Sequence, residues 1–172
     1  LVIKANNRPD GISTKMYETF MAGMENAEGL NVSTFDVFAE NLAYFGQDLF
    51  NAFGKMQNGE ELTAIEQASV ESMNKAREAL SAADIVVFAF QLWNQTIPAA
   101  LQSFIDYTYG AGYSFKYNEQ GQLVSLMTDK KYIVLNARGG NYSNPAMASM
   151  EMAVNYINNV IGGVYGMEKI GQ

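Results

Sequence analysis

The chain has 172 residues, of which 48% are hydrophobic and 17% charged, a composition typical of a globular protein with one substantial core. Eleven basic and eighteen acidic residues give a net charge of −7. Nonspecific nucleic-acid binding requires a basic surface, so this charge argues against that function. Because the chain contains neither cysteine nor histidine, disulfides, thiolate nucleophiles and Ser-His-Asp catalysis are excluded, and we expect no metal site.

The first part of the chain predicts two strands, with helical sequence after each. Residues 1–6 are mostly apolar and end in a turn-like segment, which is typical of a buried strand. From residue 13 onward apolar residues recur at helical spacing, and Ser13 or Thr14 is the expected N-cap. Residues 32–38 alternate as a second strand, and residues 40–60 are rich in aromatic residues and methionine.

The middle of the chain predicts the most buried strand. A helix is expected over residues 62–80, because Thr63 and Glu66 form a capping box at its start. Residues 85–90 are continuously apolar, which indicates a strand covered on both faces. After the loop QLWNQT, Pro98 marks the first turn of a helix that extends to about residue 109.

The last third of the chain predicts a hairpin, a further core strand and a long helix. Two alternating segments flank a polar turn at residues 118–121 and predict a hairpin over residues 112–126. Residues 131–137 predict a fourth core strand. A helix is expected over residues 145–161, and a last strand from about residue 167.

Strands that alternate with helices predict an α/β fold, a doubly wound and mostly parallel sheet of about five strands with helices on both faces. Such sheets bind ligands at the carboxyl ends of their strands. Three polar or glycine-rich loops follow the first, third and fourth strands, with the sequences NNRPDGIST, QLWNQT and RGGNYS. We therefore expect these loops to converge at one edge of the sheet and to form the ligand site.

The first two loops carry residue types that suit a flat cofactor with a phosphate. The first leads into a helix N-terminus, where free amides bind phosphate and where Ser13, Thr14 and Lys15 can add contacts. Ser13 can instead serve only as a helix cap. Trp93 and Asn94 in the second loop offer a flat wall and an amide to an aromatic ring, unless Trp93 only closes the top of the sheet.

The third loop combines a permanent charge with two glycines. Gly139 and Gly140 allow a ligand to approach the backbone closely beside Arg138, although the same residues also fit an ordinary strand-to-helix turn. Together the three loops favour a flat, phosphate-bearing cofactor. No GxGxxG or Walker motif supports a dinucleotide or nucleoside triphosphate site.

Several segments agree in order and spacing with one known family. They are LWN at 92–94, IPAALQSFID at 97–106, AGYSFKYNEQG at 111–121 and KKYIVLNARGG at 130–140, with LVIKANNRP and GISTK near the N-terminus. In these segments the chain resembles the FMN-dependent NADH-azoreductase family, which consists of flavodoxin-like NAD(P)H:quinone oxidoreductases.

The resemblance implies a flavodoxin-like fold with noncovalent FMN, in a homodimer whose two sites lie at the subunit interface. It implies an enzyme that takes a hydride from NADH or NADPH onto the flavin and then reduces a quinone or azo compound in a ping-pong cycle. No side chain is expected to be catalytic, because the flavin performs the chemistry. The residues that the resemblance assigns to FMN are Ser13, Thr14, Lys15, Leu92, Trp93, Asn94, Gln95, Ala137, Arg138, Gly139 and Gly140. It assigns Tyr117 to the substrate face.

The chain departs from the family pattern at four places. Gln91 stands where the family usually has proline, Gly11 stands where the phosphate loop usually has a first serine, and Ala137 replaces a serine of the third loop. Beyond Gly163 the family continues through a fifth strand and a final helix, which we expect to be missing here. Backbone amides can still bind a phosphate without the lost hydroxyls.

Two other functions would use the same cofactor. A flavodoxin-type electron carrier would pass single electrons to a protein partner, and an acidic docking face suits such a carrier. A flavin-binding sensor would bind FMN without turnover. The long segment between the second and third strands and the hairpin favour the enzyme, because both can build pocket walls and a dimer face.

The sequence also predicts the location of the protein. It shows no signal peptide and no stretch of about 18 uncharged apolar residues. We therefore expect a cytoplasmic protein without membrane contact, a single domain over residues 1–172 that has been trimmed at both termini.

Overall fold

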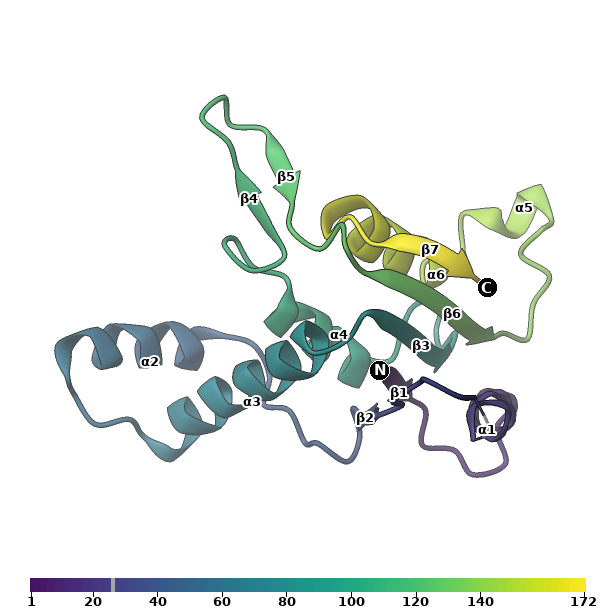
Figure 1. Cartoon of the computed structure of the whole chain (residues 1–172), viewed down its shortest axis with the longest axis horizontal. Helices are drawn as coiled ribbons and strands as arrows, with labels where there is room; N and C mark the ends of the chain where they lie inside the picture. The colour runs from purple at the N-terminus through teal and green to yellow at the C-terminus, as the bar shows by residue number, and fades with distance from the viewer. Residues whose placement is uncertain (26) are drawn as a thin grey trace.

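The computed structural model describes residues 1–25 and 27–172 and has a five-stranded parallel sheet at its centre (Figure 1). In spatial order the strands are β2 (Thr34–Asp36), β1 (Val2–Ala5), β3 (Ile85–Gln91), β6 (Lys131–Ala137) and β7 (Glu168–Gly171). Each neighbouring pair is parallel. This order confirms the predicted doubly wound α/β fold with five strands.

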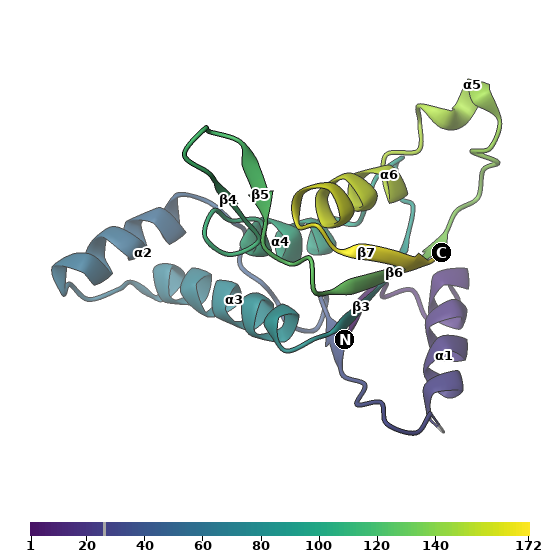
Figure 2. The same ribbon diagram turned by 45° about the horizontal axis from the view of Figure 1, so that its top comes forward.

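Helices cover both faces of the sheet, as predicted (Figure 2). One face packs against α1 (Ile12–Met24), and the other against α3 (Ala64–Ser81), α4 (Ala99–Thr108) and α6 (Val154–Ile157). The central strand β3 is buried from its second residue onward, which explains its continuously apolar sequence. In the described part of the chain, every helix is too short or too polar to cross a membrane.

Two segments extend away from the sheet. One is α2 (Gln47–Asn58), which packs against α3 and comes from the aromatic stretch of the sequence. The other is the predicted hairpin of β4 (Phe115–Tyr117) and β5 (Leu123–Ser125), which projects from the sheet at the end opposite α1 (Figure 1).

The predicted capping box of α3 is present and also joins α3 to α2. The amide of Thr63 donates to Glu66 Oε2 at 2.7 Å, and the amide of Glu66 donates to Thr63 Oγ1 at 3.4 Å. Lys55 of α2 donates to the same carboxylate at 2.8 Å. One buried carboxylate therefore satisfies the start of α3 and fixes the end of α2 against it.

We expect this cluster to make stability depend on acid pH. The hydrogen bonds from Lys55 and from the Thr63 amide lower the pKa of Glu66 from 4.5 to about 2. Because the folded-state pKa is depressed, the stabilisation is complete above the unfolded value of 4.5 and is lost as the pH falls through about 2. Urea midpoints measured over this pH range should fall more steeply for the wild type than for Glu66→Gln. Parallel curves would contradict the role of Glu66.

The start of α1 differs from the prediction. The helix begins at Ile12 with Gly11 as its N-cap, and neither Ser13 nor Thr14 caps it. Both hydroxyls instead contact residues outside the helix. Tertiary hydrogen bonds therefore replace the local capping that the sequence favours.

The helix predicted over residues 145–161 is broken. Its parts are α5 (Pro145–Ala148) and α6, which continues as the π-helical η1 (Asn158–Val164). The amide of Met152 donates to the carbonyl of Gln95 at 2.9 Å, which draws the chain between the two helices out of helical geometry. The carboxylate of Glu151 then accepts the first amides of α6 and restarts the helix.

The expectation that the chain lacks a fifth strand is wrong. Residues 168–171 form β7, which pairs with the start of β6 at the sheet edge. This strand agrees with the separate prediction of a strand from about residue 167.

Candidate functional site

A cavity of about 270 Å³ lies at the carboxyl ends of β1, β3 and β6. Its lining comes from the last residues of β3 and β6, from the three loops that follow these strands, and from the first turn of α1. The lining residues are Arg8, Gly11, Ile12, Ser13, Gln91, Leu92, Trp93, Ala137, Arg138 and Gly139. Parallel strands bring their carboxyl ends to one edge, and the three loops therefore meet there as the sequence predicts.

The N-terminus of α1 forms one side of the cavity. The amide of Lys15 donates to the carbonyl of Gly11 at 3.1 Å and closes the first turn. The amides of residues 12–14 precede this bond, and with the helix dipole they make an N-terminus of the kind that binds anions. A side chain at residue 11 would crowd this entry, because its Cβ would lie 3.1 Å from the carbonyl of Arg8.

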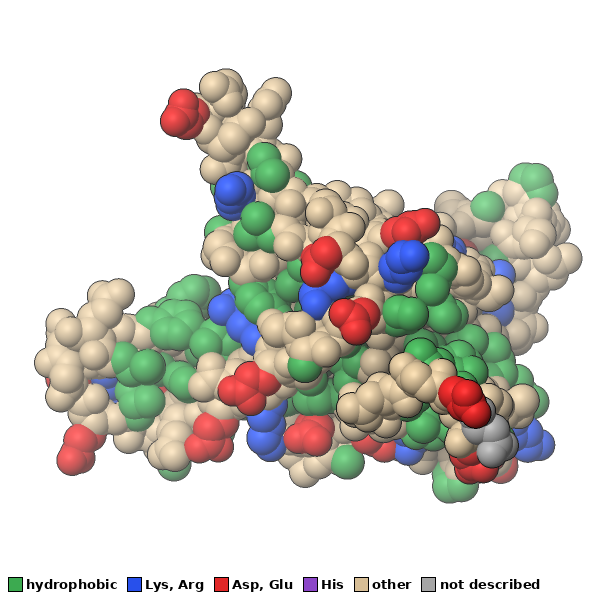
Figure 3. Space-filling view, viewed as in Figure 1, with side chains coloured by type: hydrophobic (Ala, Val, Ile, Leu, Met, Phe, Trp, Pro, Cys, Tyr) green, Lys and Arg blue, Asp and Glu red, His purple; other side chains and the backbone are tan. Residues whose placement is uncertain are grey.

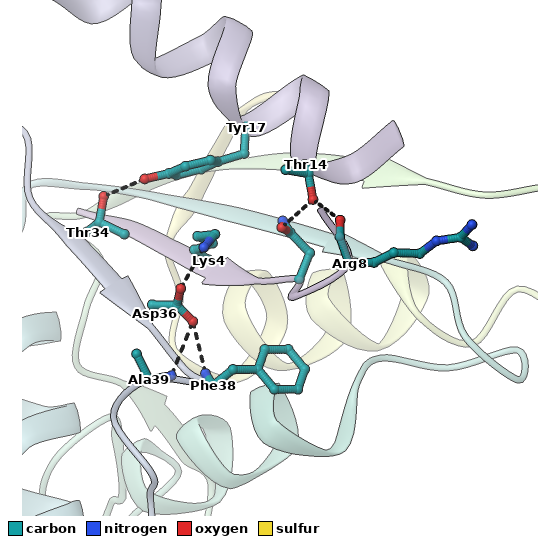
Figure 4. A network of polar contacts seen from close by, with 9 residues as sticks. Lys4, Arg8, Thr14, Tyr17, Thr34, Asp36, Phe38 and Ala39 are labelled. Atoms are coloured by element: carbon teal, nitrogen blue, oxygen red, sulfur yellow. Dashed lines mark hydrogen bonds and ion pairs between the residues drawn. The ribbon is translucent and has the colours of Figure 1, made fainter. Parts of the chain in front are cut away.

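The hydroxyls of Ser13 and Thr14 are buried and tie α1 to the strand ends. Ser13 Oγ donates to Gln91 Oε1 at 3.0 Å. Thr14 Oγ1 lies 2.9 Å from Asn6 Oδ1 and 2.7 Å from the carbonyl of Arg8 (Figure 4). These contacts position the first turn of α1 over the ends of β1 and β3.

A second polar network holds α1 and β2 to β1 (Figure 4). Lys4 Nζ lies 2.6 Å from Asp36 Oδ2, and Asp36 Oδ1 accepts from the amide of Phe38 at 3.0 Å. The hydroxyls of Tyr17 and Thr34 are 3.0 Å apart. The network connects one helix and two strands, and so supports the helix whose N-terminus borders the cavity.

The second loop is a tight turn with an unusual backbone. The amide of Trp93 donates to the carbonyl of Thr96 at 3.1 Å, and the reverse bond measures 3.0 Å. Asn94 and Gln95 have φ values of 50° and 71°, the left-handed region that such two-residue turns require. Left-handed residues other than glycine are uncommon and often mark functional sites. The turn leaves Trp93 40% exposed, so this residue lines the cavity and does not close the top of the sheet.

The third loop carries Arg138 and is fixed by contacts to both sides. The amide of Leu92 donates to the carbonyl of Ala137 at 2.9 Å, which joins the second loop to the third. Arg138 Nη1 lies 3.9 Å from the buried carboxylate of Glu151, and its guanidinium lies 5.8 Å from the ring centroid of Tyr142. Glu151, whose carboxylate also accepts the first amides of α6, therefore holds the charge of Arg138 at the cavity.

Arg8 lines the cavity, whereas Gly140 lies in the third loop outside its lining. Arg8 pairs with Asp10 at 2.8 Å, and their hydrogen bond raises the pKa of Arg8 and lowers that of Asp10. A Cβ at Gly140 would lie 2.9 Å from the Tyr142 ring, so a larger residue there would displace the end of the Tyr142 side chain. Within residues 1–25 and 27–172, acidic side chains form no cluster of three that could hold a metal ion.

The structure brings only part of the predicted site together. Ser13, Leu92, Trp93, Ala137, Arg138 and Gly139 line the cavity. The other residues assigned by the sequence are not in its lining and keep their roles as predictions: Thr14, Lys15, Asn94, Gln95, Gly140 and Tyr117. Tyr117 is 62% exposed and lies on the projecting hairpin.

Sequence reasoning did not assign four of the lining residues to the site. They are Arg8, Gly11, Ile12 and Gln91. A signal existed for Gln91, which is a polar residue at the end of an otherwise apolar strand. Arg8 and Gly11 belong to the loop that the sequence singles out, but nothing in its pattern separates them from neighbouring polar residues.

Known proteins share the fold of this chain. Residues 1–171 match the model of a family with the flavodoxin-like fold. An FMN-dependent NADH:quinone oxidoreductase from Brevibacillus brevis is 47% identical over 165 residues, which are 94% of this chain and 79% of that protein. A Bacillus subtilis protein, FMN-dependent NADH:quinone oxidoreductase 1, is 42% identical with the same coverage. The crystal structure of an azoreductase from Bacillus anthracis has a TM-score of 0.85 at 42% identity, and the match covers 99% of this chain and 84% of that one.

Proposed function

The chain belongs to the family with the flavodoxin-like fold, and from this premise we infer that it is an FMN-dependent NADH:quinone oxidoreductase and azoreductase. Relatives that are 42% and 47% identical over most of the chain carry the same cofactor and donor in their names. The observation that carries the function is the cavity at the strand ends, where a helix N-terminus, an exposed tryptophan and an arginine meet. The enzyme class and cofactor predicted from the sequence are confirmed.

The residues of the cavity fit a flat molecule with a phosphate. The N-terminus of α1 suits the phosphate, and the exposed ring of Trp93 suits a planar ring system. Arg138 adds a positive charge at the far side. Among the described residues, the buried Nε2 of Gln91 has no hydrogen-bond partner, and because Gln91 lines the cavity this donor is available to a ligand there.

When bound, FMN supplies the redox chemistry by accepting two electrons from NADH and delivering them to a quinone or azo compound. The protein contributes binding and orientation. The amides of residues 12–14 would hold the phosphate end, and the turn at residues 93–96 would support the ring system. A reaction of this kind needs no protein nucleophile, which agrees with a chain without cysteine or histidine.

Steady-state kinetics test this function. The FMN-loaded protein should oxidise NADH continuously when a quinone is present. If both substrates use one face of the cofactor in turn, double-reciprocal plots at several quinone concentrations should be parallel. The protein without FMN is the control. Bound FMN with no steady NADH oxidation would instead favour the electron carrier or the sensor.

We also propose that the protein is a homodimer, because α2 presents an apolar face to solvent. Tyr44 and Phe45 before the helix are exposed, and so are Phe50, Phe53 and Met56 along it. Figure 3 shows hydrophobic side chains gathered over this region. Exposed apolar surface of this extent is typical of a protein contact. A second copy would cover it, and Tyr117 on the exposed hairpin would then serve the partner's substrate face.

Replacing Phe50 with Asp is expected to weaken this dimer. Phe50 is 54% exposed, so the change should leave the fold intact while placing a charge in the contact. We expect a loss of about 2 kcal/mol or more, roughly 30-fold in the dimer dissociation constant. Sedimentation velocity measures it, with Asn51→Asp at an exposed polar position of the same helix as the control. A monomeric wild type would contradict the proposal.

The cytoplasmic location stays a prediction of the sequence.

A further inference from the structure

The side chain of Gln91 is buried at the carboxyl end of β3 with only one of its two polar atoms bonded. It is 7% exposed, and its Oε1 accepts from Ser13 Oγ at 3.0 Å. Its Nε2 has no partner within the described part of the chain. A buried donor without an acceptor costs free energy, because the water that it loses on folding is not replaced. Asn6, Tyr107 and Asn136 also carry a buried polar atom without a partner, but of these four side chains in the described part of the chain only Gln91 lines the cavity.

The bond to Ser13 places this donor beside the anion-binding end of α1. An amide is planar and rigid, so Nε2 lies next to the Oε1 that contacts the first turn of the helix. Gln91 and Ser13 both line the cavity, together with Gly11 and Ile12 at the start of α1. The side-chain donor and the free helix amides therefore belong to the same end of the cavity.

A neighbouring amide, Asn6, contacts the next residue of α1 but differs from Gln91. Asn6 follows β1, and the register of Ala5 with Phe90 places it beside Gln91 on the adjacent strand. Thr14 Oγ1 lies 2.9 Å from Asn6 Oδ1 and 2.7 Å from the carbonyl of Arg8, and its single proton serves only one of these two acceptors. Donation to Arg8, the closer acceptor, leaves Thr14 Oγ1 as an acceptor for the Asn6 amide, so Gln91 supplies the free side-chain donor at this end of the cavity. A buried donor beside a helix N-terminus favours an anionic oxygen ligand.

We propose that Gln91 is a cofactor-binding residue whose Nε2 donates a hydrogen bond to the phosphate of FMN at the N-terminus of α1. The proposal rests on the proposed function for the identity of the ligand. It gives this site a side-chain donor from the end of β3, in addition to the backbone amides of α1. Ser13 acts as the positioning residue, because its bond to Oε1 sets which edge of the amide meets the phosphate.

Two substitutions test the donor. Gln91→Met keeps the length of the side chain and removes both polar atoms. Gln91→Glu keeps an oxygen for Ser13 and replaces the donor with a negatively charged oxygen. Asn136→Leu is the matched control, because Asn136 is an amide near the end of β6 that lies on the opposite face of the sheet and outside the cavity.

Flavin fluorescence titrations of the full chain with FMN and with riboflavin give the readout. We expect Gln91→Met to raise the FMN dissociation constant about tenfold and to leave riboflavin binding within about twofold, since riboflavin has no phosphate. Gln91→Glu should weaken FMN binding further by charge repulsion. Asn136→Leu should bind FMN like the wild type. An unchanged FMN affinity in Gln91→Met, or an equal loss for FMN and riboflavin, would overturn the proposal.

Inorganic phosphate separates this proposal from the proposed function. Phosphate should raise the thermal midpoint of the wild type and raise that of Gln91→Met less. A wild type that binds no FMN but keeps this difference would refute the flavoenzyme while supporting the Gln91 donor. Equal phosphate stabilisation of both proteins would overturn the role of Gln91, whether or not FMN binds.

Discussion

Replacing Ser13 with Asp is expected to weaken FMN binding by about 100-fold or more. Ser13 is buried in the first turn of α1 and lines the cavity. A carboxylate there would stand where we propose that the phosphate binds, and two negative charges about 4 Å apart repel by about 4 kcal/mol at a protein surface. The helix dipole favours an acidic residue at this position, so the variant should still fold. Flavin fluorescence titration measures the loss.

Two comparisons make this result specific. Thr19→Asp adds the same charge at an exposed position of the same helix and should bind FMN like the wild type. Riboflavin lacks the phosphate, so its affinity should differ little between Ser13→Asp and the wild type. If Ser13→Asp binds FMN as tightly as Thr19→Asp does, the phosphate does not bind at the N-terminus of α1.

Replacing Gly166 with Ala is expected to destabilise the fold by about 2 to 5 kcal/mol. Gly166 connects η1 to β7 with a φ of 82°, a conformation that costs free energy for any residue with a Cβ. That Cβ would also lie 2.5 Å from the Cβ of Ser125 and 3.0 Å from Cγ2 of Thr128. The turn at Gly166 and the segment that carries Ser125 and Thr128 would have to move apart. Urea unfolding measures the loss.

Gly23→Ala is the matched control for this substitution. Gly23 lies in α1, a Cβ there would meet nothing within 4 Å, and alanine is the better helix former. This variant should be as stable as the wild type or slightly more stable. Equal unfolding free energies of the two variants would contradict the close contacts of Gly166 with Ser125 and Thr128.

The fold was predictable because its main features are local in the sequence. β3 and β6 are continuous or nearly continuous apolar runs, and polar turns separate them from the helices. The errors occur where a contact distant in sequence overrides a local preference. Ser13 is of a residue type that often caps helices, but its hydroxyl bonds to Gln91, 78 residues away. The predicted long helix breaks where Met152 bonds to Gln95.

The site was predictable in outline, because the ends of parallel strands must converge. This rule brings Ser13, Trp93 and Arg138 to one cavity. It says nothing of hairpins outside the sheet, and Tyr117 accordingly lies on a projection away from this edge. The unpaired donor of Gln91 also lies beyond sequence reasoning, because hydrogen-bond satisfaction depends on the packed side chains.

The most direct test of the function is an anaerobic titration of the FMN-loaded protein with NADH, in which absorbance spectroscopy monitors the flavin. We predict that NADH bleaches the visible flavin band and that a quinone then restores it, without any other protein present. Both steps follow from a cavity in which the chain only binds and orients the cofactor. A flavin band that NADH leaves unchanged would contradict the assignment as an NADH:quinone oxidoreductase, even if FMN is bound.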